Sequence, residues 1–83
     1  MLLFVSKDLL ARKEETMLYY MVISTDIYGV MAVGNNLVIR FRNGGEYAYI
    51  NAAHELNNLL NANSKGKYFH QFIKPYYVCK KLL

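Results

Sequence analysis

A turn signal near the middle of the chain, Asn43-Gly44-Gly45, sets the direction of the two segments beside it. An alternating run over residues 37–42 precedes it, and an aromatic run over residues 46–50 follows it. Asn-Gly and Gly-Gly pairs adopt the positive φ angles of tight hairpin turns, so this arrangement predicts an antiparallel β-hairpin. The chain is therefore expected to contain an antiparallel sheet.

The segments around the hairpin complete the predicted fold. Aromatic and β-branched runs indicate strands, whereas strong helix formers and apolar residues at helical spacing indicate helices. The predicted helices cover residues 7–16, 52–62 and 67–73, and the further strands cover residues 19–23, 27–33 and 76–82. This order predicts an α+β fold, in which a small antiparallel β-meander packs against a helix pair. An extra N-terminal helix lies in an extension over residues 1–21, before a domain over residues 22–83.

The length and composition describe one small globular domain. The chain has 83 residues, 54% of them hydrophobic and 19% charged, which is the balance of a folded chain. The apolar N-terminal run ends at Ser6 and is too short for a signal sequence or a membrane span. Cys79 is the only cysteine and favours a reducing, cytoplasmic location. With His54 and His70 it falls short of four zinc ligands, so no metal or cofactor is expected.

The positive charge of the chain is concentrated at its C-terminal end. Residues 64–83 contain five lysines and no acidic residue, whereas the rest of the chain has five basic and six acidic side chains. A local positive field attracts phosphates, acidic protein surfaces or anionic lipid. A net charge of +4 also serves solubility alone.

The hairpin loop determines which side chains share a face of the sheet, because side chains alternate along a strand. A two-residue loop places Arg40, Arg42, Tyr47 and Tyr49 on one face, and Ile39, Phe41, Ala48 and Ile50 on the core face. A Tyr–Arg face suits base stacking and phosphate contacts, although cross-strand Tyr–Arg pairs also simply stabilise sheets. A three-residue loop with a bulge would change this parity and move the tyrosines. As a separate alternative to a binding face, Tyr47 and Tyr49 lie under a helix with their hydroxyls hydrogen-bonded.

A second candidate element is the segment Ser64-Lys65-Gly66-Lys67 before the short helix. A helix start offers unpaired N–H groups to an anion, and Gly66 lets the backbone approach closely. Lys67, His70 and Lys74 share one face of that helix, opposite Phe69, Phe72 and Ile73. The alternative is structural: Ser64 caps the helix, Gly66 makes the turn, and the basic residues form a solvated face.

Three stretches together resemble the KTSC domain, named for its place at the C-terminus of some lysyl-tRNA synthetases. They are Gly44-Gly45-Glu46-Tyr47-Ala48-Tyr49, Ser64-Lys65-Gly66-Lys67-Tyr68-Phe69 and Ile73-Lys74-Pro75-Tyr76-Tyr77. The resemblance covers about residues 22–82, although Asn51-Ala52-Ala53 stands where such domains often have Val-Pro. The domain also occurs alone in small bacterial and phage proteins. The resemblance implies the fold, suggests RNA binding, and carries Tyr47, Tyr49, Ser64, Lys65, Gly66 and Tyr68 over as residues to test.

These observations favour a non-catalytic module that binds a phosphate-bearing ligand, either single-stranded RNA or a small nucleotide. A phage protein that sequesters a nucleotide signal of host defence is one form of this function. The candidate ligand-binding residues are Arg40, Arg42, Tyr47, Tyr49, Ser64, Lys65, Gly66, Lys67, Tyr68, His70 and Lys74.

The alternative function is a phage-type protein-interaction module that inhibits a host protein. Its contact segments would be the apolar runs Met1–Val5 and Tyr19–Met21, since Tyr and Met are frequent at interfaces. The hydrophobic fraction also favours a homodimer, because association would bury more apolar surface. Enzymatic activity is not expected, because Cys79 and His70 are the only residues that suggest a nucleophile and its base.

Overall fold

The computed structural model describes residues 19–83. The predicted helix over residues 7–16 and the apolar run Met1–Val5 lie outside the described residues. The described elements, in chain order, are β2 (Tyr20–Met21), β3 (Ile27–Val33), β4 (Asn36–Phe41), β5 (Glu46–Tyr49), the 3₁₀ turn η2 (Ala53–Glu55), α1 (Leu56–Asn61), α2 (Lys65–Tyr68), the π-helical segment η3 (Phe69–Ile73) and β6 (Cys79–Lys81).

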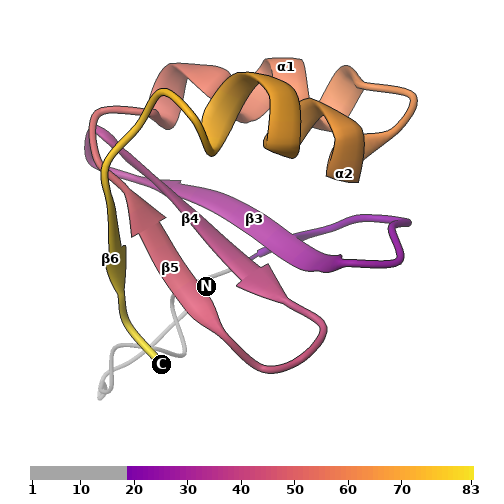
Figure 1. Ribbon diagram of the computed structural model, residues 1–83, viewed down its shortest axis with the longest axis horizontal. Coiled ribbons are helices and arrows are strands. Elements are labelled where there is room, and N and C mark those ends of the chain that lie inside the picture. The colour runs from indigo at the N-terminus through magenta and orange to yellow at the C-terminus, as the bar shows by residue number, and fades with distance from the viewer. Residues whose placement is uncertain (1–18) are drawn as a thin grey trace, which may run out of the picture.

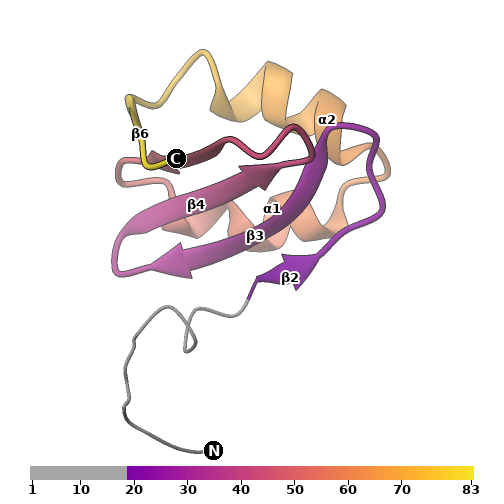
Figure 2. The same ribbon diagram turned by 90° about the horizontal axis from the view of Figure 1, so that it is seen from below.

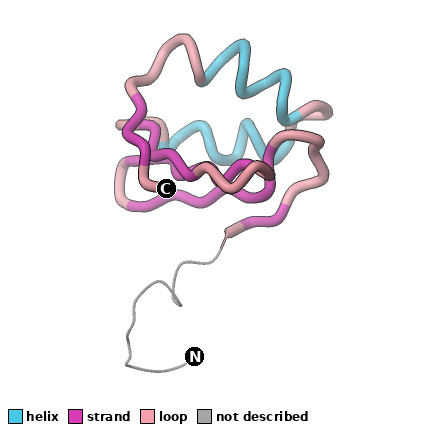
Figure 3. The backbone as a smooth tube through the Cα atoms, turned by 60° about the horizontal axis from the view of Figure 1, so that its bottom comes forward, coloured by secondary structure: helices cyan, strands magenta, loops and turns pink. Residues whose placement is uncertain are grey.

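The strands form one antiparallel sheet in the order β2-β3-β4-β5-β6 (Figure 2). Short turns join β2 to β5 in succession, whereas the helices come between β5 and β6 in the chain. The helical segments form a layer over one face of this sheet (Figures 1 and 3). The α+β class, with its antiparallel meander and helix pair, is therefore confirmed.

The core lies between the sheet and the helices. Its fully buried side chains include Ile27, Val30, Leu37, Ile39, Leu59 and Ile73. All six are apolar, so their removal from water drives the helix layer onto the sheet.

The prediction that Phe72 shares a buried face with Phe69 and Ile73 is wrong. Phe72 is 49% exposed, and its ring packs against Tyr68 at a centroid distance of 4.9 Å. The cause is the π turn of η3, in which the Lys74 amide donates to the Phe69 carbonyl at 2.8 Å. A π turn winds less per residue than an α-helix, so Phe72 rotates away while Phe69 and Ile73 stay directed at the sheet.

The hairpin loop has three residues, so the predicted faces of Tyr47, Tyr49 and Ala48 are wrong, whereas Ile39 and Phe41 lie on the core face as predicted. The Phe41 amide donates to the Gly45 carbonyl at 2.8 Å, which leaves residues 42–44 as the loop. Gly44 has a φ angle of 97°, a conformation that favours glycine. In the resulting register Ile39 lies opposite Tyr47, and Arg40 lies opposite Glu46.

The extra loop residue moves both tyrosines to the helix-covered face, with Ile39 and Phe41. Tyr49, opposite Leu37, belongs to the main core, and Tyr47 packs against it. Ala48 instead joins a smaller cluster with Met31 and Val38, against which Tyr19 packs. The predicted face that would unite Arg40 and Arg42 with these tyrosines therefore does not exist.

Arg42 fastens the loop between β2 and β3 to the hairpin. Its Nε atom donates to the Ser24 carbonyl at 2.7 Å, and its Nη2 atom donates to the Val22 carbonyl at 3.3 Å. The Arg42 amide also donates to the Asp26 carbonyl at 2.9 Å. These bonds position residues 24–26 at the edge of the space between sheet and helices.

Candidate functional site

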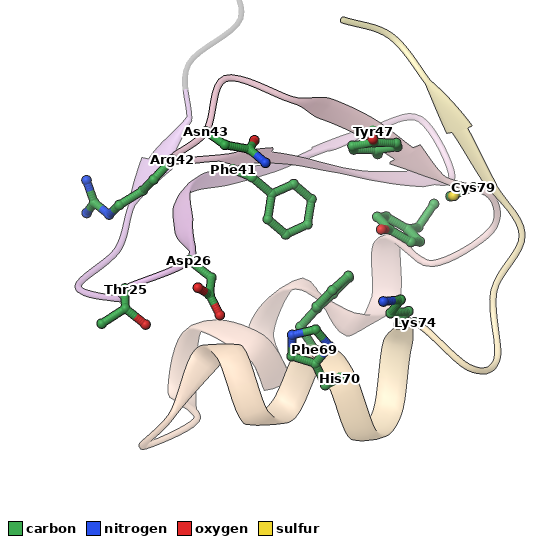
Figure 4. A pocket seen from close by; sticks show the side chains of 11 residues that line it. Thr25, Asp26, Phe41, Arg42, Asn43, Tyr47, Phe69, His70, Lys74 and Cys79 are labelled. Atoms are coloured by element: carbon green, nitrogen blue, oxygen red, sulfur yellow. The ribbon is translucent and has the colours of Figure 1, made fainter.

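Two clefts open between the sheet and the segment α2–η3, each with a volume of about 590 Å³. They share Thr25, Asp26 and His70 in their linings, so they adjoin, and we call them together the sheet–helix groove. The first cleft is lined by β4, the hairpin, β5 and η3 (Figure 4), and the second by the Ser64 segment and the loop after β2. Each volume lies within the range of small-molecule sites, roughly 300–1,000 Å³.

Four aromatic rings form the floor of the first cleft. Phe69 lies 5.3 Å from Phe41 and 5.4 Å from Tyr49, and Phe41 lies 5.8 Å from Tyr47, all in edge-to-face geometry between ring centroids. Phe69 and Tyr49 are buried, whereas Phe41 and Tyr47 are only partly buried. The latter two therefore present aromatic surface on which a planar group could stack.

Tyr49 supplies a neutral hydroxyl beside this floor. Burial, together with the neighbouring Cys79 and Tyr47 side chains, raises the pKa of Tyr49 to about 12. The hydroxyl therefore remains protonated at neutral pH and can act as a hydrogen-bond donor.

The groove carries basic side chains that form no ion pair with an acidic side chain within residues 19–83. The one such contact between a basic and an acidic side chain in this part of the chain joins His54 to Glu55, outside both clefts. His70 and Lys74 line the first cleft from the helix side, and Lys67 lines the second. The Arg42 side chain points away from the first cleft, toward the carbonyls that it binds (Figure 4).

The Ser64 segment has structural roles as well as a place in the second cleft. Ser64 caps α2, because its Oγ atom accepts from the Lys67 amide at 3.3 Å. The Lys65 Nζ atom donates to the Ala62 carbonyl at 2.7 Å and so satisfies the end of α1. A Cβ atom at Gly66 would lie 3.6 Å from Asp26 Oδ2, so this turn approaches the loop before β3 closely.

Tyr68 lies outside both clefts and binds Glu55. The Tyr68 hydroxyl donates to Glu55 Oε1 at 2.6 Å, and the Tyr77 hydroxyl donates to Glu55 Oε2 at 2.9 Å. Partial burial opposes ionisation of Glu55, but these hydrogen bonds, with Asn58 and nearby His54, outweigh it and lower the pKa of the carboxyl. The cluster ties the helix pair to the segment that leads into β6.

Arg40 also lies outside both clefts. Its guanidinium is 5.9 Å from the centre of the Tyr28 ring, and that of Arg42 is 5.6 Å from the same ring. Both distances are those of cation–π contacts, and such contacts stabilise the sheet in the absence of a ligand. Arg40 and Tyr68 are thus the two predicted site residues that the groove does not include.

The groove brings together the other nine of the eleven predicted residues, from two motifs that are far apart in the sequence. Sequence reasoning missed Asp26, which lines both clefts, and assigned Phe41 to the core alone. The polar run Ser24-Thr25-Asp26 between two strands was the available signal for Asp26. The three-residue loop, which brings Tyr47 and Tyr49 to the same face as Phe41, was an alternative that the sequence left open.

Cys79 and His70 both line the first cleft. No hydrogen bond joins their side chains within the part of the chain that the structure describes. Within residues 19–83 there is also no group of three His, Cys, Asp or Glu side chains that could hold a metal ion. No helix among these residues is long and apolar enough to cross a membrane.

Comparison with known proteins identifies the fold and the family. The family model described as KTSC domain matches residues 31–77. The crystal structure of a KTSC domain protein from Yersinia pestis is 30% identical in sequence, with 80% of this chain and 97% of that chain covered and a TM-score of 0.72. Among curated proteins, none matches. The chain therefore belongs to the KTSC domain family.

Proposed function

We propose that this protein is a non-catalytic binding module for a phosphate-bearing ligand that occupies the sheet–helix groove. The observation that carries the proposal is the juxtaposition of an accessible aromatic floor with basic side chains that form no ion pair within residues 19–83. Stacking surfaces and positive charge together are what a nucleotide, free or within a single strand, requires.

The lysines of the groove favour an anionic ligand because they are positively charged, and they lie on the helix side, opposite the aromatic side chains of the strands. His70 and Lys74 are four residues apart in the helical segment and line the same cleft. Lys67 extends this charge into the adjoining cleft. A phosphate that lies between Lys67 and Lys74 would accept charge-assisted hydrogen bonds from them, and no ion pair among the described residues would have to break.

The aromatic floor favours a ligand with a planar ring. The rings of Phe41 and Tyr47 are partly exposed and are fixed by their edge contacts, so they lose little freedom when a base stacks on them. Stacking of this kind is worth about 1–3 kcal/mol per base. Inorganic phosphate alone is therefore expected to bind more weakly than a nucleotide.

Charge reversal in the groove tests the proposal. The Lys67→Glu/Lys74→Glu variant should lose at least about tenfold in affinity for a labelled single-stranded RNA or for a mononucleotide, because each lysine is replaced by a repelling charge. Lys65 is kept, because it caps α1. The Lys80→Glu/Lys81→Glu variant makes the same change in charge on β6, outside both clefts, and should retain the affinity.

Salt dependence separates the two forms of ligand. RNA affinity should fall steeply with salt, in proportion to the number of phosphates contacted, whereas a mononucleotide should show a shallow slope. Equal loss of affinity in the two charge-reversal variants would contradict the groove as the site. Chromatography of the nucleotide after incubation checks that it is bound and not converted.

A second candidate function is a protein-interaction module, of the phage type that inhibits a host protein. The observation that favours it is that the apolar side chains of Tyr76, Val78 and Leu83, on either side of the edge strand β6 in the sequence, are exposed. Edge strands with unpaired backbone groups pair readily with other chains. A protein partner that binds the wild type but not Val78→Asp would support this function, and a partner indifferent to that substitution would contradict it.

A further inference from the structure

We propose that the sheet–helix groove selects a guanine-type base, and that the Asp26 carboxylate recognises this base by accepting hydrogen bonds from it. This inference rests on the proposed function, because it names the class of nucleotide that the same groove would take. Asp26 places in the groove an acidic side chain that binding of a phosphate alone would not need.

Among residues 19–83, Asp26 is the only acidic side chain that lines either cleft, and it lines both. Its neighbours in the linings include Lys67, His70 and Lys74. Within residues 19–83 no basic side chain forms an ion pair with it, and its carboxylate accepts no hydrogen bond there. A negative charge in this place repels a phosphate, so its contribution to binding must come through hydrogen-bond donors on another part of the ligand.

The position of Asp26 indicates which part of a nucleotide that is. Figure 4 shows Asp26 and Lys74 at opposite ends of the first cleft, with Phe41 and Phe69 between them. A nucleotide with its phosphate at Lys74 and its base on Phe41 therefore directs the outer edge of the base, not the ribose, toward Asp26.

The chemistry of the bases then favours guanine. Its outer edge carries a ring N–H next to an exocyclic NH₂, so two adjacent donors can meet the two oxygens of one carboxylate. Adenine, cytosine and uracil each place an acceptor beside their donor, and that acceptor is repelled by a carboxylate. A carboxylate thus binds guanine and disfavours the other bases at the same time.

The backbone of Asp26 is held in place before any ligand binds. Its amide donates to Ser24 Oγ at 3.2 Å, and its carbonyl accepts from the Arg42 amide at 2.9 Å. Arg42 Nε also donates to the Ser24 carbonyl at 2.7 Å. The loop backbone is therefore fixed to the hairpin and loses little freedom on binding, while the exposed carboxylate itself stays open to a ligand.

Calorimetric titration of the full chain with three monophosphates tests the inference. GMP offers two donors to Asp26, inosine monophosphate offers one, and AMP places an acceptor there. The wild type should bind them with affinities in that order, with about tenfold or more between GMP and AMP, since charge-assisted hydrogen bonds are strong.

Two nearly isosteric variants complete the test. Asp26→Asn should remove the preference, by weakening GMP binding about tenfold while AMP binding stays equal or improves. Glu46→Gln removes the same charge outside both clefts and should keep the preference. A melting curve for each variant verifies that it is folded.

The outcomes distinguish the two proposals. If the wild type binds GMP and AMP equally, or if Asp26→Asn binds GMP as tightly as the wild type, the role of Asp26 is overturned while nucleotide binding stands. If none of the three monophosphates binds, and a guanine-containing RNA oligonucleotide does not bind either, the proposed function fails and this inference fails with it.

Discussion

At the scale of the residue, Glu55 shows how the family motifs serve the fold. Its side chain is 13% exposed and accepts hydrogen bonds from Tyr68 and Tyr77. Because these bonds hold the pKa of Glu55 below its ordinary value, the carboxylate stabilises the folded state above the unfolded pKa of a glutamate. This stability is lost as the pH falls through the lower, folded-state pKa.

We therefore expect Glu55→Gln to lower the free energy of unfolding by about 1 kcal/mol at pH 7, since a neutral acceptor replaces a charged one in a partly solvated cluster. Urea denaturation at pH 7 and at pH 3 measures the free energy of unfolding of both proteins. The wild type should lose more stability between these pH values than the variant does. Parallel losses in the two proteins would show that Glu55 does not carry this pH dependence.

Residue roles were the part of the site that the sequence predicted least well. Lys65 and Ser64 were candidates for an anion site, but both also cap helices. Lys65 binds a carbonyl at the end of α1, and Ser64 caps the start of α2, because the chain passes here from one helix to the next. Nothing in the local sequence says that the Ala62 carbonyl lies within reach of Lys65. Asp26 was missed because its partners in the groove, such as His70, are distant in the chain.

At the scale of the element, the hairpin decides which side chains enter the groove. Gly44, with its φ angle of 97°, makes the three-residue loop that turns Tyr47 and Tyr49 toward the helices. An L-residue in a left-handed conformation costs about 1–2 kcal/mol. We expect Gly44→Ala to lower the free energy of unfolding by that amount in urea denaturation.

Gly66 provides the matched control for this prediction. It lies in α2 without a positive φ angle, and an added Cβ would make only an ordinary contact with Asp26. Gly66→Ala should leave stability unchanged or raise it by up to about 1 kcal/mol, because alanine favours helices. Equal destabilisation by the two substitutions would contradict the role assigned to the Gly44 conformation.

The elements themselves were largely predictable. The strand over residues 27–33 has the predicted bounds, and the helix predicted over 52–62 corresponds to η2 and α1. Periodicity could not reveal the π turn of η3, because it depends on packing of Phe69 and Ile73 against the sheet. The predicted last strand over 76–82 shortens to Cys79–Lys81, since the Tyr76 and Tyr77 amides still donate to the Ile73 carbonyl and the Tyr77 hydroxyl is bound to Glu55.

At the scale of the whole molecule, the groove exists because α2–η3 spans the helix-covered face while the hairpin and the β2–β3 loop close its sides. The sequence predicted both motifs and their charge, but their proximity depends on the sheet order and the hairpin register. The central proposal is therefore that a phosphate-bearing ligand with a planar base binds in this groove.

The most direct test is a ¹H–¹⁵N NMR titration of the full chain with GMP in low salt. The account predicts concentration-dependent shifts of the amides of Asp26, Phe41, His70 and Lys74, which line the first cleft. The amides of Met31 and Val38, whose side chains belong to the cluster on the other face of the sheet, should move least. Shifts centred on that other face, or no shifts with either millimolar GMP or a guanine-containing RNA oligonucleotide, would contradict binding in the groove.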